Sequence, residues 1–93
     1  MLLVARVPGV TDPSVFRTEA EAALAALATR PGWVSGRLGQ ALDDPTCWVV
    51  VCEWNDVGSG RRGLTTGAVR TAIMPLMARF PNEPGTFEVI SRS

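Results

Sequence analysis

The spacing of apolar residues in the first third of the chain predicts a strand followed by a helix. Leu2 to Val7 is an apolar run that Pro8-Gly9 closes, which is typical of a strand. Asp12 followed by Pro13 indicates a helix start, because a carboxylate can accept hydrogen bonds from free amides and proline needs no N–H there. The helix itself is predicted by apolar residues at helical spacing, namely Phe16, Ala20, Ala23, Leu24 and Leu27. Pro31-Gly32 is expected to end it.

The middle of the chain predicts a hairpin. Residues 47–54, Cys-Trp-Val-Val-Val-Cys-Glu-Trp, are apolar on both faces until Glu53, so a strand covered on both sides is expected. Trp33 to Leu42 alternates loosely and contains two glycines, which indicates a strand with a bend or bulge. Asp43-Asp44-Pro45 between them is typical of a turn.

The last third predicts a helix and a strand. The glycine-rich segment from Asp56 to Gly67 favours only a short, weak helical turn. Ala68 to Phe80 follows as a second helix, which Pro75 should kink or split because an interior proline removes a hydrogen bond. Gly85 to Ser91 predicts the last strand. The order β-α-β-β-α-β is the ferredoxin-like α+β arrangement, in which two helices cover one face of a four-stranded antiparallel sheet, in one domain spanning residues 1–93.

The uncovered face of this sheet predicts a homodimer. It would expose the second apolar side of the strand at residues 47–54, and monomers rarely tolerate such a patch. A chain of 93 residues is also near the lower end for burying a sizeable core alone. We therefore expect the sheets of two copies to pack together.

Composition excludes several classes of function. Nine arginines balance nine acids, and this zero net charge gives no field to attract nucleic acid or acidic membranes. Histidine, lysine and tyrosine are absent, which excludes histidine-ligated metals, histidine-activated nucleophiles, lysine Schiff bases and tyrosine acids. No metal site is expected. Cys47 and Cys52 are predicted to be free thiols, and the N-terminus lacks the order of a secretory signal, so a cytoplasmic protein is expected.

Three features are candidates for a site. Gly58 to Gly63 matches G-x-G-x-x-G, but a hairpin precedes it where a nucleotide site needs a parallel βαβ unit, so a flexible connection is favoured. In that segment Arg61 and Arg62 are candidate anion contacts at the mouth of a pocket.

Trp33, Trp48 and Trp54 either fill the core or form aromatic walls that orient a flat ligand, with Met74 and Met77 as adaptable walls. Glu53 is the one charge in its strand. If it is buried, its pKa should rise and make it a candidate general base; the favoured alternative is an arginine partner, Arg6 or Arg37, or exposure at the strand end.

Four segments are similar to the antibiotic biosynthesis monooxygenase family of dimeric α+β barrels. These are residues 2–7, Pro-Gly-Trp-Val-Ser-Gly at 31–36, Leu-Asp-Asp-Pro at 42–45, and above all residues 48–57 leading into Gly-Arg-Arg-Gly-Leu at 60–64. The resemblance covers essentially the whole chain. The alanine- and arginine-rich, lysine-free composition also resembles proteins of high-GC actinobacteria.

The resemblance implies a pocket between sheet and helices, and for some members oxidation of phenolic polycyclic substrates with O₂ and no cofactor. It implies Glu53 and Asn55 as candidate catalytic residues, with Asp56 a further candidate base. Candidate substrate-binding residues are Trp33, Trp48, Trp54, Arg61, Arg62, Ile73 and Met77.

The sequence departs from the family at several of these places. A helix histidine and a tryptophan serve the haem-degrading branch, and Ile73 and Gly63 take their places, so that chemistry is not expected. Many relatives have an aromatic residue where this chain has Gly60, and a second aromatic is replaced near Gly67; these losses should enlarge or loosen the pocket wall. The expected function is a cofactor-independent monooxygenase acting on a small aromatic or polyketide-derived molecule. The alternative is a cyclase, isomerase or ligand-binding protein on the same scaffold.

Overall fold

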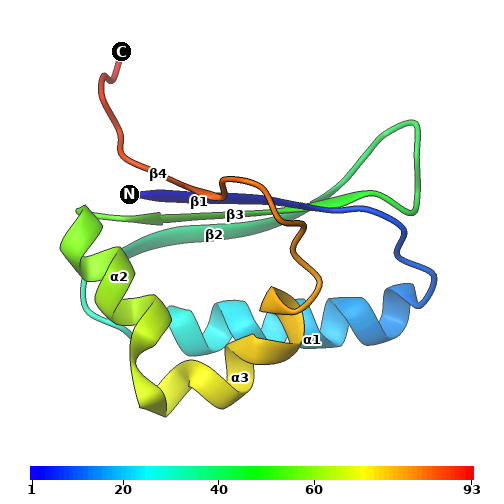
Figure 1. Ribbon diagram of the computed structural model, residues 1–93, viewed down its shortest axis with the longest axis horizontal. Helices are drawn as coiled ribbons and strands as arrows, with labels where there is room; N and C mark the ends of the chain where they lie inside the picture. Colours follow the sequence, from blue (N-terminus) through cyan, green and yellow to red (C-terminus); the bar gives the residue numbers. More distant parts are fainter.

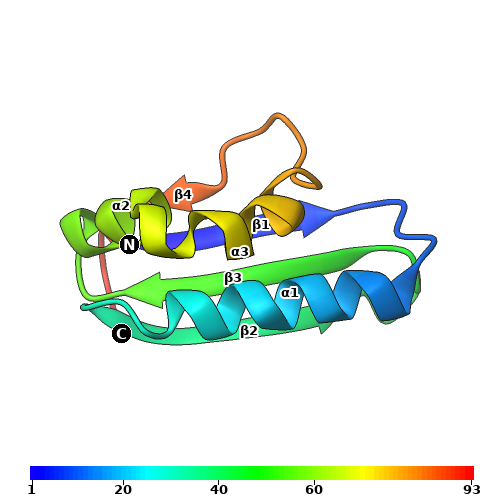
Figure 2. The same ribbon diagram turned by 90° about the horizontal axis from the view of Figure 1, so that it is seen from below.

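A computed structural model describes all residues 1–93 and shows three helices on one face of a four-stranded antiparallel sheet (Figures 1 and 2). In chain order the elements are β1 (Leu2–Val7), α1 (Pro13–Leu27), β2 (Trp33–Gln40), β3 (Trp48–Trp54), α2 (Val57–Thr65), α3 (Gly67–Met77) and β4 (Thr86–Phe87). The strand order β2-β3-β1-β4 is that of the ferredoxin-like arrangement, so the predicted fold class is confirmed.

The sheet separates a buried face from an open one. β3 shows the alternation most clearly: Trp48, Val50, Cys52 and Trp54 are buried beneath the helices, and the residues between them point to the other face. β1 lies antiparallel to β3 with Val4 opposite Val51, and its buried residues face the same side. The core therefore lies between the two central strands and the helices.

The first helix has the predicted stripe and begins at Pro13 as predicted, but it ends earlier than expected. Phe16, Ala20, Ala23 and Leu27 are buried, as expected. The helix ends at Leu27 rather than at Pro31-Gly32, and the chain turns through Gly32 at φ +86°. A side chain at Gly32 would also collide with Ser59 of α2, whose Oγ would lie 2.3 Å from the added Cβ, so this turn requires glycine.

The glycine-rich segment forms a regular helix, so the expectation of a weak turn was wrong. The Asp56 carboxylate accepts a hydrogen bond from the Ser59 amide at 2.7 Å and caps α2, which offsets the low helix propensity of its glycines. α3 then continues through Pro75 to Met77, so the predicted split does not occur. Pro75 lies in the last turn of α3, where losing one hydrogen bond interrupts little of the helix.

The last strand is much shorter than predicted, because only Thr86 and Phe87 belong to β4. Phe87 pairs with Leu2 at the start of β1. The residues after Phe87 therefore run past the N-terminal end of β1 and have no strand to pair with. They form a tail that leaves the sheet on its open side (Figure 1).

The open face is apolar along its centre. Val4 and Phe87 are 37% and 45% exposed, and Leu2, Val49 and Val51 are half-buried beside them. No helix is long and apolar enough to cross a membrane. Cys47 and Cys52 are free thiols, as predicted, and burial raises the pKa of Cys52 to about 12, which makes it a poor nucleophile.

Arg79 joins the end of the α3 region to the start of α1. It donates to Asp12 at 2.8 and 3.1 Å and to Glu19 at 2.9 Å, and its guanidinium lies 5.2 Å from the centre of the Phe16 ring. The Asp12 side chain makes no capping hydrogen bond, so its predicted capping role was wrong. Its carboxylate instead holds the two helices together.

Replacing Arg79 should destabilise the fold in a pH-dependent way. The hydrogen bonds from Arg79 lower the pKa of Asp12, so their contribution is complete above the unfolded pKa of about 3.9 and is lost as pH falls through the lower folded value. We expect Arg79→Gln to lower the thermal midpoint by roughly 3–6 °C at pH 7, and by less below pH 4. Arg17→Gln, which removes an exposed pair with Glu21, is the control. An equal loss at both pH values would contradict this role.

The second prediction about the fold concerns the Asp56 cap of α2. Asp56→Ala should lower the thermal midpoint by roughly 3–6 °C, and Asp56→Ser should retain most of the stability because its hydroxyl can also accept from the Ser59 amide. Asp43→Ala in the hairpin turn removes an acid without removing a cap. If Asp43→Ala and Asp56→Ala have the same effect, the cap does not stabilise α2.

Candidate functional site

Two adjoining depressions lie where α2 and α3 approach the β4 edge of the sheet. The first has a volume of about 330 Å³ and is bounded by α2, β4 and the start of β1. The second has a volume of about 430 Å³ and lies along α3. Leu64 lines both, so we treat them as one groove.

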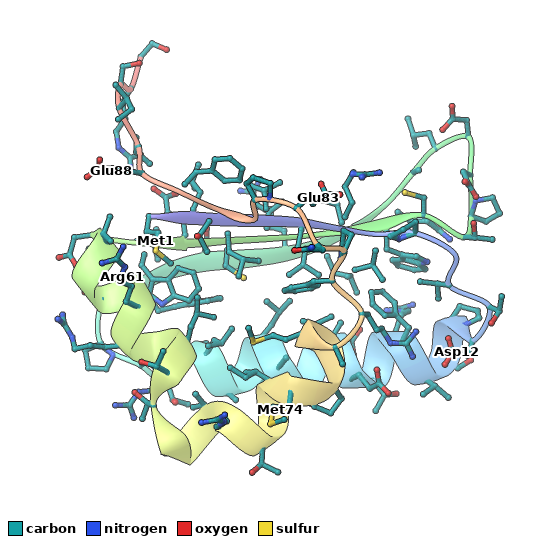
Figure 3. The ribbon with its side chains drawn as sticks, viewed as in Figure 1. Met1, Asp12, Arg61, Met74, Glu83 and Glu88 are labelled. Atoms are coloured by element: carbon teal, nitrogen blue, oxygen red, sulfur yellow. The ribbon has the colours of Figure 1, made fainter.

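The groove is mostly apolar and has few polar groups. Arg61 and Glu88 line the first depression, together with Met1, Val57, Leu64, Thr86 and Phe87. Figure 3 shows Met1, Arg61 and Glu88 at the same end of the sheet. The second depression is formed by Ile73, Met74 and Met77 of α3, and Arg70 is its single charged residue. An apolar groove with an acid and an arginine at one end and a single arginine along α3 suits a flat ligand with a polar edge.

Three of the predicted substrate-binding residues line this groove. Arg61 lies in the first depression, and Ile73 and Met77 lie in the second. Ile73 is almost completely buried and forms the floor, whereas Met77 is 40% exposed and forms a wall. Arg62 faces a different depression beside the turn after α1.

The tryptophans fill the core instead of lining the groove. The Trp33 and Trp54 rings meet edge to face with centroids 5.3 Å apart, and Trp48 packs against Phe16 at 5.4 Å. Trp54 is completely buried. The core alternative therefore describes these rings better than the alternative of aromatic walls.

Met1 occupies the space beside Gly60. A Cβ at Gly60 would lie 2.3 Å from Met1 Cε and 2.7 Å from its sulfur. The expectation that Gly60 enlarges the pocket was therefore wrong at this position, because the flexible thioether fills the gap. The periodicity of the helices gave no sign that the first residue of the chain would lie there.

The two candidate catalytic residues lie outside the groove. Glu53 is on the open face of the sheet and pairs with Arg92 of the tail, whereas the sequence suggested Arg6 or Arg37. Arg6 pairs with Glu83 at 2.6 Å instead. Asn55 lines a third depression of about 470 Å³, between α2 and the tail. Their catalytic roles stay predictions.

Asp56 lines the same depression as Asn55 but is a weak base. The hydrogen bond from the Ser59 amide, with a smaller contribution from Arg62, holds the pKa of its carboxyl below the usual value. The acid that lines the groove is Glu88, which the sequence analysis did not single out. No sequence pattern marked it, because its position depends on where the chain leaves β4.

Comparison with known proteins supports the fold. The structure is similar to that of SnoaB, a cofactor-independent oxygenase from Streptomyces nogalater, at 26% identity, with a TM-score of 0.79, over 98% of this chain and 93% of that one. A variant of SnoaB gives a TM-score of 0.83 at 24% identity over the same shares.

A protein from Nitrosomonas europaea, classed with the antibiotic biosynthesis monooxygenases, gives a TM-score of 0.73 at 17% identity, over 96% of this chain and 88% of that one. No family model and no curated protein matches the sequence. These structural similarities show that the chain has the fold of antibiotic biosynthesis monooxygenase-like proteins, and they agree with the family resemblance seen in its sequence.

Proposed function

We propose that this protein is a cofactor-independent monooxygenase that oxidises a small aromatic, polyketide-type molecule with O₂. The observation that carries the proposal is the apolar groove between α2, α3 and β4, on a fold shared with the cofactor-independent oxygenase SnoaB. Its two depressions together are of the size that ligand pockets of small molecules have.

The chemistry needs an acidic C–H next to an aromatic ring system, as in an anthrone. Loss of the proton gives a carbanion whose charge is shared with the ring oxygen. The carbanion transfers electrons to O₂ and forms a hydroperoxide, which loses water to leave a carbonyl. The CH₂ and O₂ are thereby converted into C=O and H₂O, so the substrate supplies all of the electrons that reduce oxygen.

Two residues at the charged end of the groove suit these steps. The Glu88 carboxylate can accept the proton, and the Arg61 guanidinium can stabilise the negative oxygen that develops on the ring system. Ile73 and Met77 would contact the apolar rings. Trp54 lies behind α2 and supports the helix that carries Arg61.

The first test is O₂ uptake with an anthrone, compared with the rate of autoxidation without enzyme. We expect a saturable acceleration that chelators do not reduce. Met77→Trp should narrow the groove and lower the acceleration by about tenfold, whereas Val15→Trp on the exposed side of α1 should leave it unchanged. Equal loss in both variants would show that the groove is not the site.

Two carboxylate variants decide between the competing bases. Glu88→Gln should lower turnover by about tenfold or more, because general base catalysis typically contributes at least that much. Glu53→Gln should lower it only if the assignment from the resemblance is correct, since Glu53 faces the opposite side of the sheet. Glu21→Gln, an exposed acid on α1, is the control.

A ligand-binding or isomerase role is the second candidate. One observation favours this second role: the groove contains neither a phenol nor an imidazole, and Glu88 is its single acid. Binding of the same anthrone in an anaerobic titration, together with no acceleration of O₂ uptake in air, would support this candidate.

We also propose that two copies associate through the open face of the sheet. Leu2, Val4, Val49, Val51 and Phe87 form a continuous apolar strip there, and covering it would remove apolar surface from water. Light scattering should give twice the mass of one chain. Val51→Lys should give single chains, whereas Val15→Lys on α1 should remain dimeric. A single-chain mass for the unmodified protein would refute the proposal.

A further inference from the structure

A polar depression lies on the other side of α2 from Arg61. It has a volume of about 320 Å³ and is bounded by the turn after α1 and by the second half of α2. Its lining residues are Arg30, Pro31, Arg62, Gly63, Thr65 and Thr66, so no large apolar side chain reaches it. The groove on the opposite side of α2 is mostly apolar, and the two sites therefore suit different ligands.

Two buried donors beside this depression have no acceptor in the protein. They are Arg30 Nε and Trp54 Nε1. Arg30 and Gly63 line the depression, and Trp54 lies behind Gly63: a Cβ on Gly63 would be 3.1 Å from Trp54 Nε1 and 3.8 Å from Arg30 Cβ. Buried N–H groups are nearly always hydrogen-bonded in proteins, so two unpaired donors at one place favour a site that accepts a group rich in oxygen.

The charges of the depression are not neutralised by ion pairs. Arg30 and Arg62 take part in none of the five ion pairs of the chain. Arg62 Nη2 reaches Ser59 Oγ at 3.5 Å, the limit of a hydrogen bond. Asp56 is the acid that Arg62 influences, and its carboxylate already accepts from the Ser59 amide.

The threonines at the rim do not supply donors. Thr65 Oγ1 donates to the Arg61 carbonyl, and Thr66 Oγ1 donates to the Arg62 carbonyl. The two guanidinium groups are therefore the available cations and the main donors of the depression, and they belong to different elements.

We propose that this depression binds a tetrahedral oxyanion of the phosphate or sulfate class between Arg30 and Arg62. Planar guanidinium groups donate pairs of N–H bonds to such oxygens. A tetrahedral anion presents oxygens in several directions and can meet donors from two elements, whereas a carboxylate presents one edge. The volume exceeds that of one such anion and leaves space for a few water molecules of about 30 Å³ each.

The test is a phosphate titration at constant ionic strength, followed through the indole N–H signals in a ¹H–¹⁵N spectrum. The Trp54 signal is identified by elimination with Trp33→Phe and Trp48→Phe. We expect a saturable shift of the Trp54 signal. Arg62→Gln and Arg30→Gln should each weaken binding about tenfold or more, as expected for a charged hydrogen-bond partner. Arg61→Gln, one residue away on α2 and facing the groove, should change the affinity less than twofold.

Three outcomes would overturn the proposal. Equal shifts with chloride at the same ionic strength would indicate general screening. Equal losses in Arg61→Gln and Arg62→Gln would indicate attraction to the whole surface of α2. Acetate binding as tightly as phosphate would show that the site takes a carboxylate. The indole spectrum of each variant without phosphate verifies its fold, and none of these results depends on oxygenase activity.

Discussion

The burial of the Trp54 indole between the sheet and α2 is the constraint on which much of this structure depends. Trp54 is completely buried, its backbone amide donates to the Met1 carbonyl at 2.9 Å, and its ring meets Trp33 edge to face. The facing helix must approach closely, and Gly63 permits this, because even a methyl group there would lie 3.1 Å from the indole nitrogen. A glycine-rich helix is therefore a packing requirement here, and the Asp56 cap offsets its low propensity.

The close approach of α2 also divides the surface into two chemically different sites. Arg61 and Arg62 are neighbours in sequence but point to opposite sides of the helix, as the 100° rotation per residue allows when both side chains are long. Arg61 reaches the apolar groove near β4, and Arg62 reaches the polar depression beside the α1–β2 turn. One pair of arginines thus serves two separate surfaces.

The groove has a different character from the one that the sequence suggested. Its walls are aliphatic and thioether side chains from α2 and α3, and the large aromatic rings lie in the core. Met1 fills the space next to Gly60, so the absence of an aromatic residue at this place does not leave a void. Catalysis in such a groove would depend on the acidity of the substrate, because the protein supplies one carboxylate and one guanidinium at its charged end.

The sequence by itself determined the order of the strands, the helices α1 and α3, the two faces of β3 and the ferredoxin-like class, because these follow from residue spacing within single segments. It also predicted Ile73, Met77 and Arg61 in positions that line the groove. Tertiary structure alone decided that Glu53 turns to the open face toward Arg92, that Asp12 pairs with Arg79 instead of capping α1, and that the strand after Gly85 stops at Phe87. Each of these outcomes depends on a residue distant in sequence: the partner of a charge, or the point where a neighbouring strand ends, is set by how the elements pack, and no local pattern contains that information.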